Sequence, residues 1–157
     1  MTIQSFDIYT ARGYAGDLVD SGPNVSQTGI VEAATLAIGV AVKRGTVATN
    51  PRHIVVDADG GNIFGIVRRE LALEAKNRPS DGTTEFKQTE SASILRQGYI
   101  YVTVETNAVT AGALMSVNNT GGFSGAGAGA VATTNVTAEQ TGQIGDVIKA
   151  RIDIVAA

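Results

Sequence analysis

The single histidine, His53, is the first place to look for acid–base chemistry in this chain. A serine hydrolase needs a nucleophile, a base and an orienting acid brought together. Serines are present, but His53 would have to serve as the only base, from within a strand of a predicted hairpin. A lone histidine with no Cys or acid cluster assigned to it is most often a strand or surface residue. The sequence therefore predicts no catalytic residue.

The segment DADGGN, residues 57–62, is the nearest approach to a metal site. Its alternating acids suggest a calcium loop, but the third alternate acid and the terminal Glu of that motif are missing. Asp and Asn favour turns unaided, and Gly60 and Gly61 supply the positive φ angles that tight turns require. We therefore interpret the segment as a turn and predict no metal site. The absence of cysteine also excludes disulfides and thiolate metal sites.

Two further kinds of active site are also unsupported. Paired carboxylates could hydrolyse a glycoside, but Asp57 and Asp59 are turn residues, and aromatic residues that could stack on a sugar make up only 5% of the chain. The segment GGFSGAGAGAVA, residues 121–132, lacks the Lys and the following helix of a phosphate-binding loop. It is predicted to be a flexible loop. We expect no cofactor and no enzymatic activity.

Length and composition indicate one domain with a modest core. The chain has 157 residues, 43% of them hydrophobic, and 19 glycines, as expected for many short strands joined by tight turns. Its net charge of -3 argues against a nucleic-acid surface, which needs clustered Lys and Arg. No run of about 18 apolar residues is present, so no membrane span is expected.

The elements that would carry any site are predicted strands. Residues 98–105 alternate strictly, and a period of two marks a strand with one buried face. A second run at residues 114–117 follows a turn and is closed by a polar, Gly-rich turn at 118–122, which is typical of antiparallel β-structure. The buried face is predicted to hold Ile100, Val102 and Val104, and the opposite face Tyr99, Tyr101, Thr103 and Glu105.

Alternation recurs elsewhere in the chain. It predicts one strand at residues 36–43, a hairpin of residues 53–57 and 63–68, and a final strand at 147–155. Residues 70–90 form a long polar connection, with room for a short helical turn at 71–75. The inward face of the final strand is predicted to hold Ile148, Ala150, Ile152 and Ile154.

We therefore predict an all-β fold, a small single-domain β-barrel or jelly-roll-like sandwich, with an extended N-terminal arm. Residues 1–29 form the arm and residues 30–157 the barrel domain; the alternative for the first segment is an edge strand followed by a long loop. The small face of Ala37, Gly39 and Ala41 would let another sheet or subunit approach closely. This favours a homo-oligomer.

The order of several short segments resembles the structural cement (capsid decoration) proteins of tailed phages. Each segment is mostly glycine and apolar spacing, and the resemblance extends roughly from residue 10 to residue 155. The segments are residues 13–18, 38–46, 64–68, 94–104 and 109–123, followed by the final apolar strand.

The resemblance implies a mechanical function. Such a protein would bind the major capsid protein on the outer surface of the head, bridge neighbouring subunits and oppose the pressure of packaged DNA. It implies a homotrimer at three-fold or a homodimer at two-fold positions, made in the host bacterial cytoplasm and located in the virion. It offers no catalytic, cofactor or metal residue. The alternative is a carbohydrate- or receptor-binding β-module of a fibre or pilus. A cluster of exposed aromatic residues would favour such a module, but the chain has only four tyrosines.

Overall fold

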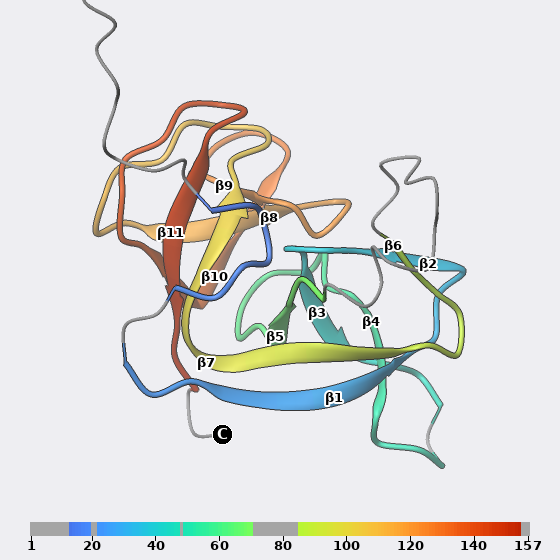
Figure 1. The fold of residues 1–157 in the computed structure, drawn as a ribbon. Helices are drawn as coiled ribbons and strands as arrows, with labels where there is room; N and C mark the ends of the chain where they lie inside the picture. The colour runs from blue at the N-terminus through green and yellow to red at the C-terminus, as the bar shows by residue number, and fades with distance from the viewer. Residues whose placement is uncertain (1–12, 20–21, 48, 71–84, 155–157) are drawn as a thin grey trace, which may run out of the picture.

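The structure is a computed structural model that describes residues 13–19, 22–47, 49–70 and 85–154. These residues form eleven strands and no helix, arranged as two small barrels side by side (Figure 1). The predicted all-β barrel fold is thereby confirmed. None of the described segments is a helix long and apolar enough to cross a membrane.

The first barrel is a closed ring of five strands in the order β1-β4-β3-β5-β7, with β7 pairing back onto β1. All neighbours are antiparallel except β1 and β4. A two-stranded ribbon, β2 with β6, contributes Leu36 and Phe86 to the core of this barrel. The elements are β1 Val25–Val31, β2 Thr35–Ala37, β3 Ala41–Arg44, β4 His53–Val56, β5 Gly65–Val67, β6 Glu85–Lys87 and β7 Ser91–Thr103.

The second barrel uses the other half of β7, in the order β7-β11-β10-β8-β9. Its strands are β8 Leu114–Asn118, β9 Phe123–Ser124, β10 Ala130–Ala138 and β11 Val147–Ile152. The ring closes where β9 returns to the end of β7. There Val104 and Phe123 form a parallel bridge, and the Glu105 N–H donates to the Phe123 carbonyl at 2.8 Å.

Strand β7 passes from one barrel into the other at Gly98. The pairing with β1 ends at Gln97, and the pairing with β11 begins at Gly98. Gly98 has a φ of +129°, and a Cβ at this position would collide with the side chain of Asn24. Only glycine combines this backbone conformation with such a close approach.

The core has two clusters that meet at β7. Ile94 belongs to the cluster inside the first barrel, whereas the next residue, Leu95, belongs to the cluster of the second. Two adjacent residues of one strand are both buried because its two faces serve different barrels. Ile100, Val102 and Val104 are fully buried, as the alternation predicted. On the opposite face, Tyr99, Tyr101 and Thr103 are half-buried and Glu105 is exposed.

The single strand predicted at residues 36–43 is wrong. Gly39, with a φ of +77°, separates β2 from β3, and the two strands lie in different sheets. The apolar alternation continues through the break, so periodicity alone could not reveal it. Gly39 packs against Ala15 of the same chain, and Ala41 is fully buried. The small face thus serves internal packing.

The predicted hairpin of residues 53–57 and 63–68 is also wrong in its pairing. Both strands exist, but β3 lies between them, with Val42 opposite both Val56 and Gly65. The tight turn at residues 57–62 is confirmed, with φ angles of +70° and +69° at Gly60 and Gly61. Alternation locates strands without identifying the neighbour that each one chooses.

Three further segments differ from prediction. The flexible loop predicted at residues 121–132 contains β9 and the start of β10, and its Phe123 is buried. The polar connection at residues 70–90 contains β6, while the helical turn proposed at 71–75 lies outside the described residues. The last strand ends at Ile152, so Ile154 is 44% exposed instead of facing inward.

The segment predicted as an arm, residues 1–29, enters the first barrel before its end. Residues 25–29 belong to β1 and pair with β7, from Val25 opposite Gln97 to Gly29 opposite Ala92. Residues 1–12 and 20–21 lie outside the described part of the chain.

Truncation of the core of β7 is expected to destabilise the whole fold. Ile100→Ala should lower the free energy of unfolding by about 2–4 kcal/mol, because Ile100 is fully buried. Thr103→Ala, on the opposite face of the same strand, should change it by about 0.5 kcal/mol or less. Urea unfolding monitored by circular dichroism measures both values. Equal effects for the two variants would contradict the assignment of faces.

Candidate interaction surface at the junction of the barrels

Residues 13–19 lie along β7, joined to it by an isolated antiparallel bridge between Leu18 and Ile100. The Gly16 N–H donates to the Tyr101 carbonyl at 2.8 Å, and the Tyr101 N–H donates to the Asp17 carbonyl at 3.0 Å. The Val19 N–H donates to the Tyr99 carbonyl at 3.1 Å. This segment occupies the edge of β7 beyond the point where β1 stops pairing with it. The described part of the predicted arm is therefore bonded into the sheet.

A tight turn in this segment displays Tyr14. The Asp17 carboxylate accepts from the Tyr14 N–H at 2.9 Å, and the Asp17 N–H donates to the Tyr14 carbonyl at 3.0 Å. Gly16 has a φ of +85°. A Cβ at this position would collide with the Ile38 side chain and lie 2.8 Å from the backbone nitrogen of Arg69. The turn can therefore seat against its neighbours only with glycine at position 16.

Tyr14 is held in place although it is 68% exposed. The Arg69 guanidinium carbon lies 4.2 Å from the centre of the Tyr14 ring, which is a cation–π contact. A guanidinium nitrogen of Arg69 also lies 3.6 Å from the Asp17 carboxylate. The aromatic ring is thus presented in a fixed position, with little conformational freedom left to lose on binding.

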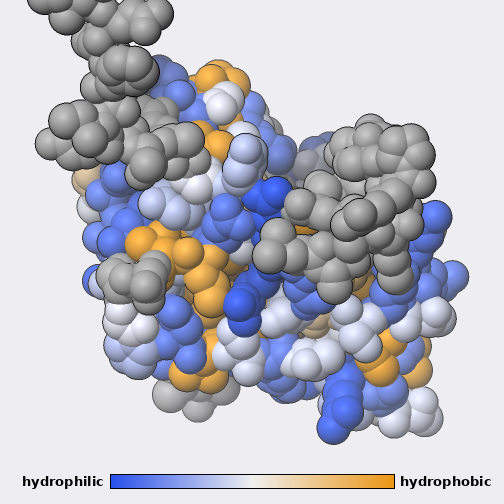
Figure 2. Space-filling view, viewed as in Figure 1, coloured by the Kyte–Doolittle hydropathy of each residue, from blue (hydrophilic) through white to orange (hydrophobic). Residues whose placement is uncertain are grey.

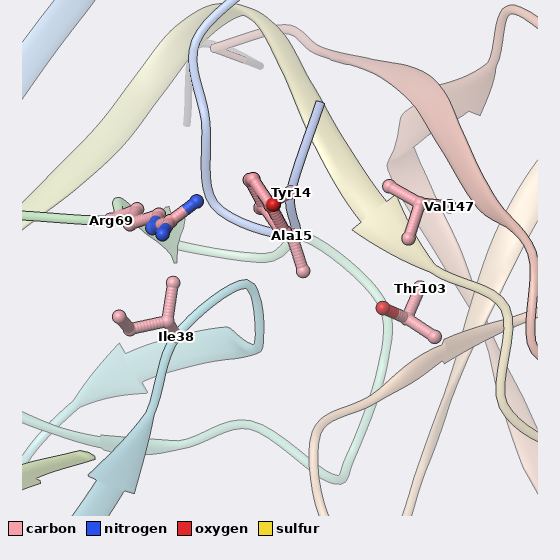
Figure 3. A pocket seen from close by; sticks show the side chains of 6 residues that line it. All are labelled: Tyr14, Ala15, Ile38, Arg69, Thr103 and Val147. Carbon is pink, nitrogen blue, oxygen red and sulfur yellow. The ribbon is translucent and has the colours of Figure 1, made fainter. Parts of the chain in front are cut away.

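A hollow of about 340 Å³ surrounds this tyrosine. Figure 3 shows Tyr14 in the middle, with Arg69 and Ile38 on one side and Thr103 and Val147 on the other. The lining comes from both barrels and from the 13–19 segment. It combines apolar side chains with two hydroxyl groups and one guanidinium. Figure 2, drawn from the same side as Figure 1, shows an apolar patch over the second barrel in largely hydrophilic surroundings.

This arrangement is suited to binding. Aromatic residues with a polar tip and arginine are enriched in the centres of protein interfaces. The described residues that line the hollow include no carboxylate or imidazole that could transfer protons. Over the described residues, no group of three or more His, Asp and Glu side chains could hold a metal ion.

His53 is a strand residue, at the start of β4, and contacts a glutamate. Its Nδ1 atom lies 3.8 Å from Glu32 Oε2 and has no hydrogen-bond partner among the described residues. Glu32 is engaged by Thr46, which donates both its hydroxyl and, at 2.9 Å, its N–H. The Thr46 hydroxyl is the main reason why the pKa of Glu32 lies below its ordinary value. Glu32, which directly follows β1, therefore contacts both the start of β4 and the loop after β3.

The two acids of the predicted turn do not converge on a common point. Asp59 pairs with Lys43 on the surface. Asp57 is 3% exposed, and its carboxylate accepts from the Asp59 N–H at 3.0 Å. Burial raises the pKa of Asp57 above its ordinary value. The acids therefore shape the turn, as residue types that favour turns would do.

Sequence reasoning missed the Tyr14–Arg69 pair. Tyr14 lies in a Gly-rich segment without periodicity, and Arg69 directly follows β5. No local pattern joins residues so distant in the chain, and only the pairing of the 13–19 segment with β7 brings them together.

Comparisons with known proteins give one family match and one similar solved fold. The family model described as "Structural cement protein (E217 gp24/Pam3 gp6)" matches residues 3–153. Among solved structures, a chain of the capsid of Myoviridae phage XM1 has a similar fold, with a TM-score of 0.64 and 18% sequence identity. The alignment covers 94% of this chain and 96% of that one. No curated protein gives a significant match.

The turn that displays Tyr14 yields a test of its packing. Gly16→Ala should lower the free energy of unfolding by about 2–3 kcal/mol, because it combines backbone strain with a steric collision. Gly145→Ala is the matched control, since Gly145 has a similar φ of +89° but no atom within 4 Å of an added Cβ. It should cost only about 1 kcal/mol. Chemical denaturation of both variants gives the difference; equal costs would show that the turn is not tightly seated.

Proposed function

Because the chain belongs to the structural cement protein family, whose model spans nearly all of it, we propose that it stabilises a phage head from the outside. It binds the major capsid protein, bridges neighbouring subunits and opposes the pressure of packaged DNA. The family match over residues 3–153 is the observation that carries this proposal. The role is structural, and the protein acts by contact and not by catalysis.

This role requires a large buried contact area and a rigid protein. A stable contact between proteins buries about 1,000 Å² or more, and linked contacts reinforce one another when geometry permits simultaneous engagement. Two closed barrels that share a strand provide a rigid body able to span neighbouring subunits. Modest contacts, repeated over a symmetric lattice, then resist expansion together.

We assign one of these contacts to the hollow around Tyr14. Its exposed ring is fixed by Arg69 in advance of binding, which favours its use as an anchor. The alternative of a carbohydrate- or receptor-binding module would need a platform of exposed aromatic rings. Of the aromatic residues in the described part of the chain, only Tyr14 is exposed.

The binding surface can be tested with phage heads that lack this protein. Wild-type protein should bind them and raise the temperature at which they release DNA. Tyr14→Ser should weaken binding by about tenfold or more with an unchanged melting temperature of the free protein, since exposed anchors contribute to binding and little to folding. Cosedimentation and thermal scans measure the two properties.

The matched comparison is Tyr101→Ser. Tyr101 is half-buried, with Gly13 packed directly on its ring, so its loss should lower the melting temperature of the free protein. Heads that bind wild-type protein without any gain in thermal stability would contradict the stabilising role.

We further propose that the protein acts as a homodimer or homotrimer, because it must match the symmetry of the head. In this proposal the arm extends from residue 1 up to the start of β1, and residues 1–12 contact a neighbouring copy. Light scattering should give a dimer or trimer mass for the full chain. Deletion of residues 1–12 should reduce that mass without altering the melting temperature, since the 13–19 segment is retained. A full chain that is monomeric both free and on heads would overturn the proposal.

A further inference from the structure

A second hollow, of about 240 Å³, lies in a strongly basic part of the surface. Its lining includes Lys43, Arg44 and Arg96, with the ring of Phe64 among them. The chain as a whole carries a net charge of -3, so this concentration of positive charge is local.

The two arginines share one aromatic ring. The guanidinium carbon of Arg96 lies 4.0 Å from the centre of the Phe64 ring, and that of Arg44 lies 4.7 Å from it. Because both distances end at the same ring centre, the two guanidinium carbons can be no farther apart than the sum of these distances. Stacking on an aromatic ring orients a planar guanidinium and leaves its N–H donors free to point outward.

Neither arginine is neutralised by an acid within the described residues. Arg44 donates to the Pro51 carbonyl at 2.7 Å, and Arg96 donates to the side-chain oxygen of Gln27 at 3.2 Å. Both of these acceptors are uncharged. The Nε atom of Arg96 is buried and has no hydrogen-bond partner in the described part of the molecule. Lys43, by contrast, is paired with Asp59.

This arrangement carries an electrostatic cost. Burial, and to a lesser extent the charge of Arg44, lower the pKa of Arg96. Two like charges held beside one ring repel each other, and a buried donor without an acceptor is unfavourable. An incoming anion would relieve the repulsion, and a carboxylate has two oxygens that can accept from both guanidinium groups.

We propose that the hollow formed by Arg44, Phe64 and Arg96 receives an Asp or Glu side chain of the major capsid protein. The inference rests on the proposed function and specifies the chemistry of one contact. Phe64 and the partly exposed Ile154 provide an apolar wall for the methylene groups of that side chain. The fork of N–H donors on each arginine favours a planar carboxylate.

The test uses the full chain and phage heads that lack this protein. The variant Arg44→Gln/Arg96→Met removes both charges, while the unbranched Met side chain still packs on Phe64. It should bind heads about tenfold or more weaker than wild type, because charge-assisted hydrogen bonds are lost. Its melting temperature should be unchanged or raised. Arg52→Gln/Lys87→Gln is the control, since both residues are exposed and lie outside the hollow; its affinity should fall by less than about threefold.

Competition identifies the bound group. A short polyglutamate peptide should displace wild-type protein from heads, whereas a single-stranded oligonucleotide of equal charge should not. Stronger displacement by the oligonucleotide would mark a phosphate site and overturn the proposal. Equal affinity of wild type and Arg44→Gln/Arg96→Met would overturn it while leaving the proposed function intact. Wild-type protein that fails to bind heads would remove the proposed function itself, and the inference with it.

Discussion

The backbone hydrogen bonding of β7 is the constraint on which the rest of this structure depends. Both edges of the strand have partners on each side of Gly98, namely β1 and β5 before it and β11 and residues 16–19 after it. A shift of one residue in this register would turn Ile100 and Val102 away from the core. It would also move the glycine away from the point where Asn24 crowds the strand.

Closing the two barrels leaves their described strands few unpaired edges, so the proposed contacts would depend on side chains at the junction. The junction is itself fixed by a buried amide. Asn135 of β10 accepts from the Ile63 N–H at 2.9 Å and donates to the Ile63 carbonyl at 2.8 Å. Because the amide replaces a strand pairing at this point, the loop before β5 is held against the second barrel. The basic hollow, which both residues line, takes its shape from this contact.

The sequence was sufficient to place the faces of β7 and the tight turn at Gly60 and Gly61, because these depend on local alternation and backbone conformation. It did not reveal β10, whose inward positions include the polar residues Thr133 and Asn135. The Thr133 hydroxyl donates to the Met115 carbonyl across the sheet, at 2.8 Å, and also lies 3.4 Å from the Val136 carbonyl. Contacts such as Tyr14 on Arg69, or Arg44 and Arg96 on Phe64, likewise depend on pairings between distant segments, which no local pattern encodes.

Sharing β7 also has a consequence for the order of events during synthesis. Val25 of β1 can pair with Gln97 of β7 only after Gln97 has left the ribosome. Synthesis proceeds at roughly 5–20 residues per second. The second half of β7 cannot pair with β11 until residues 147–152 have been synthesised. Neither barrel can close around a complete core early, and folding dominated by such non-local pairings is slow. The nascent chain therefore carries unpaired apolar strands for most of its translation, and these stay exposed to aggregation until the last strand is made.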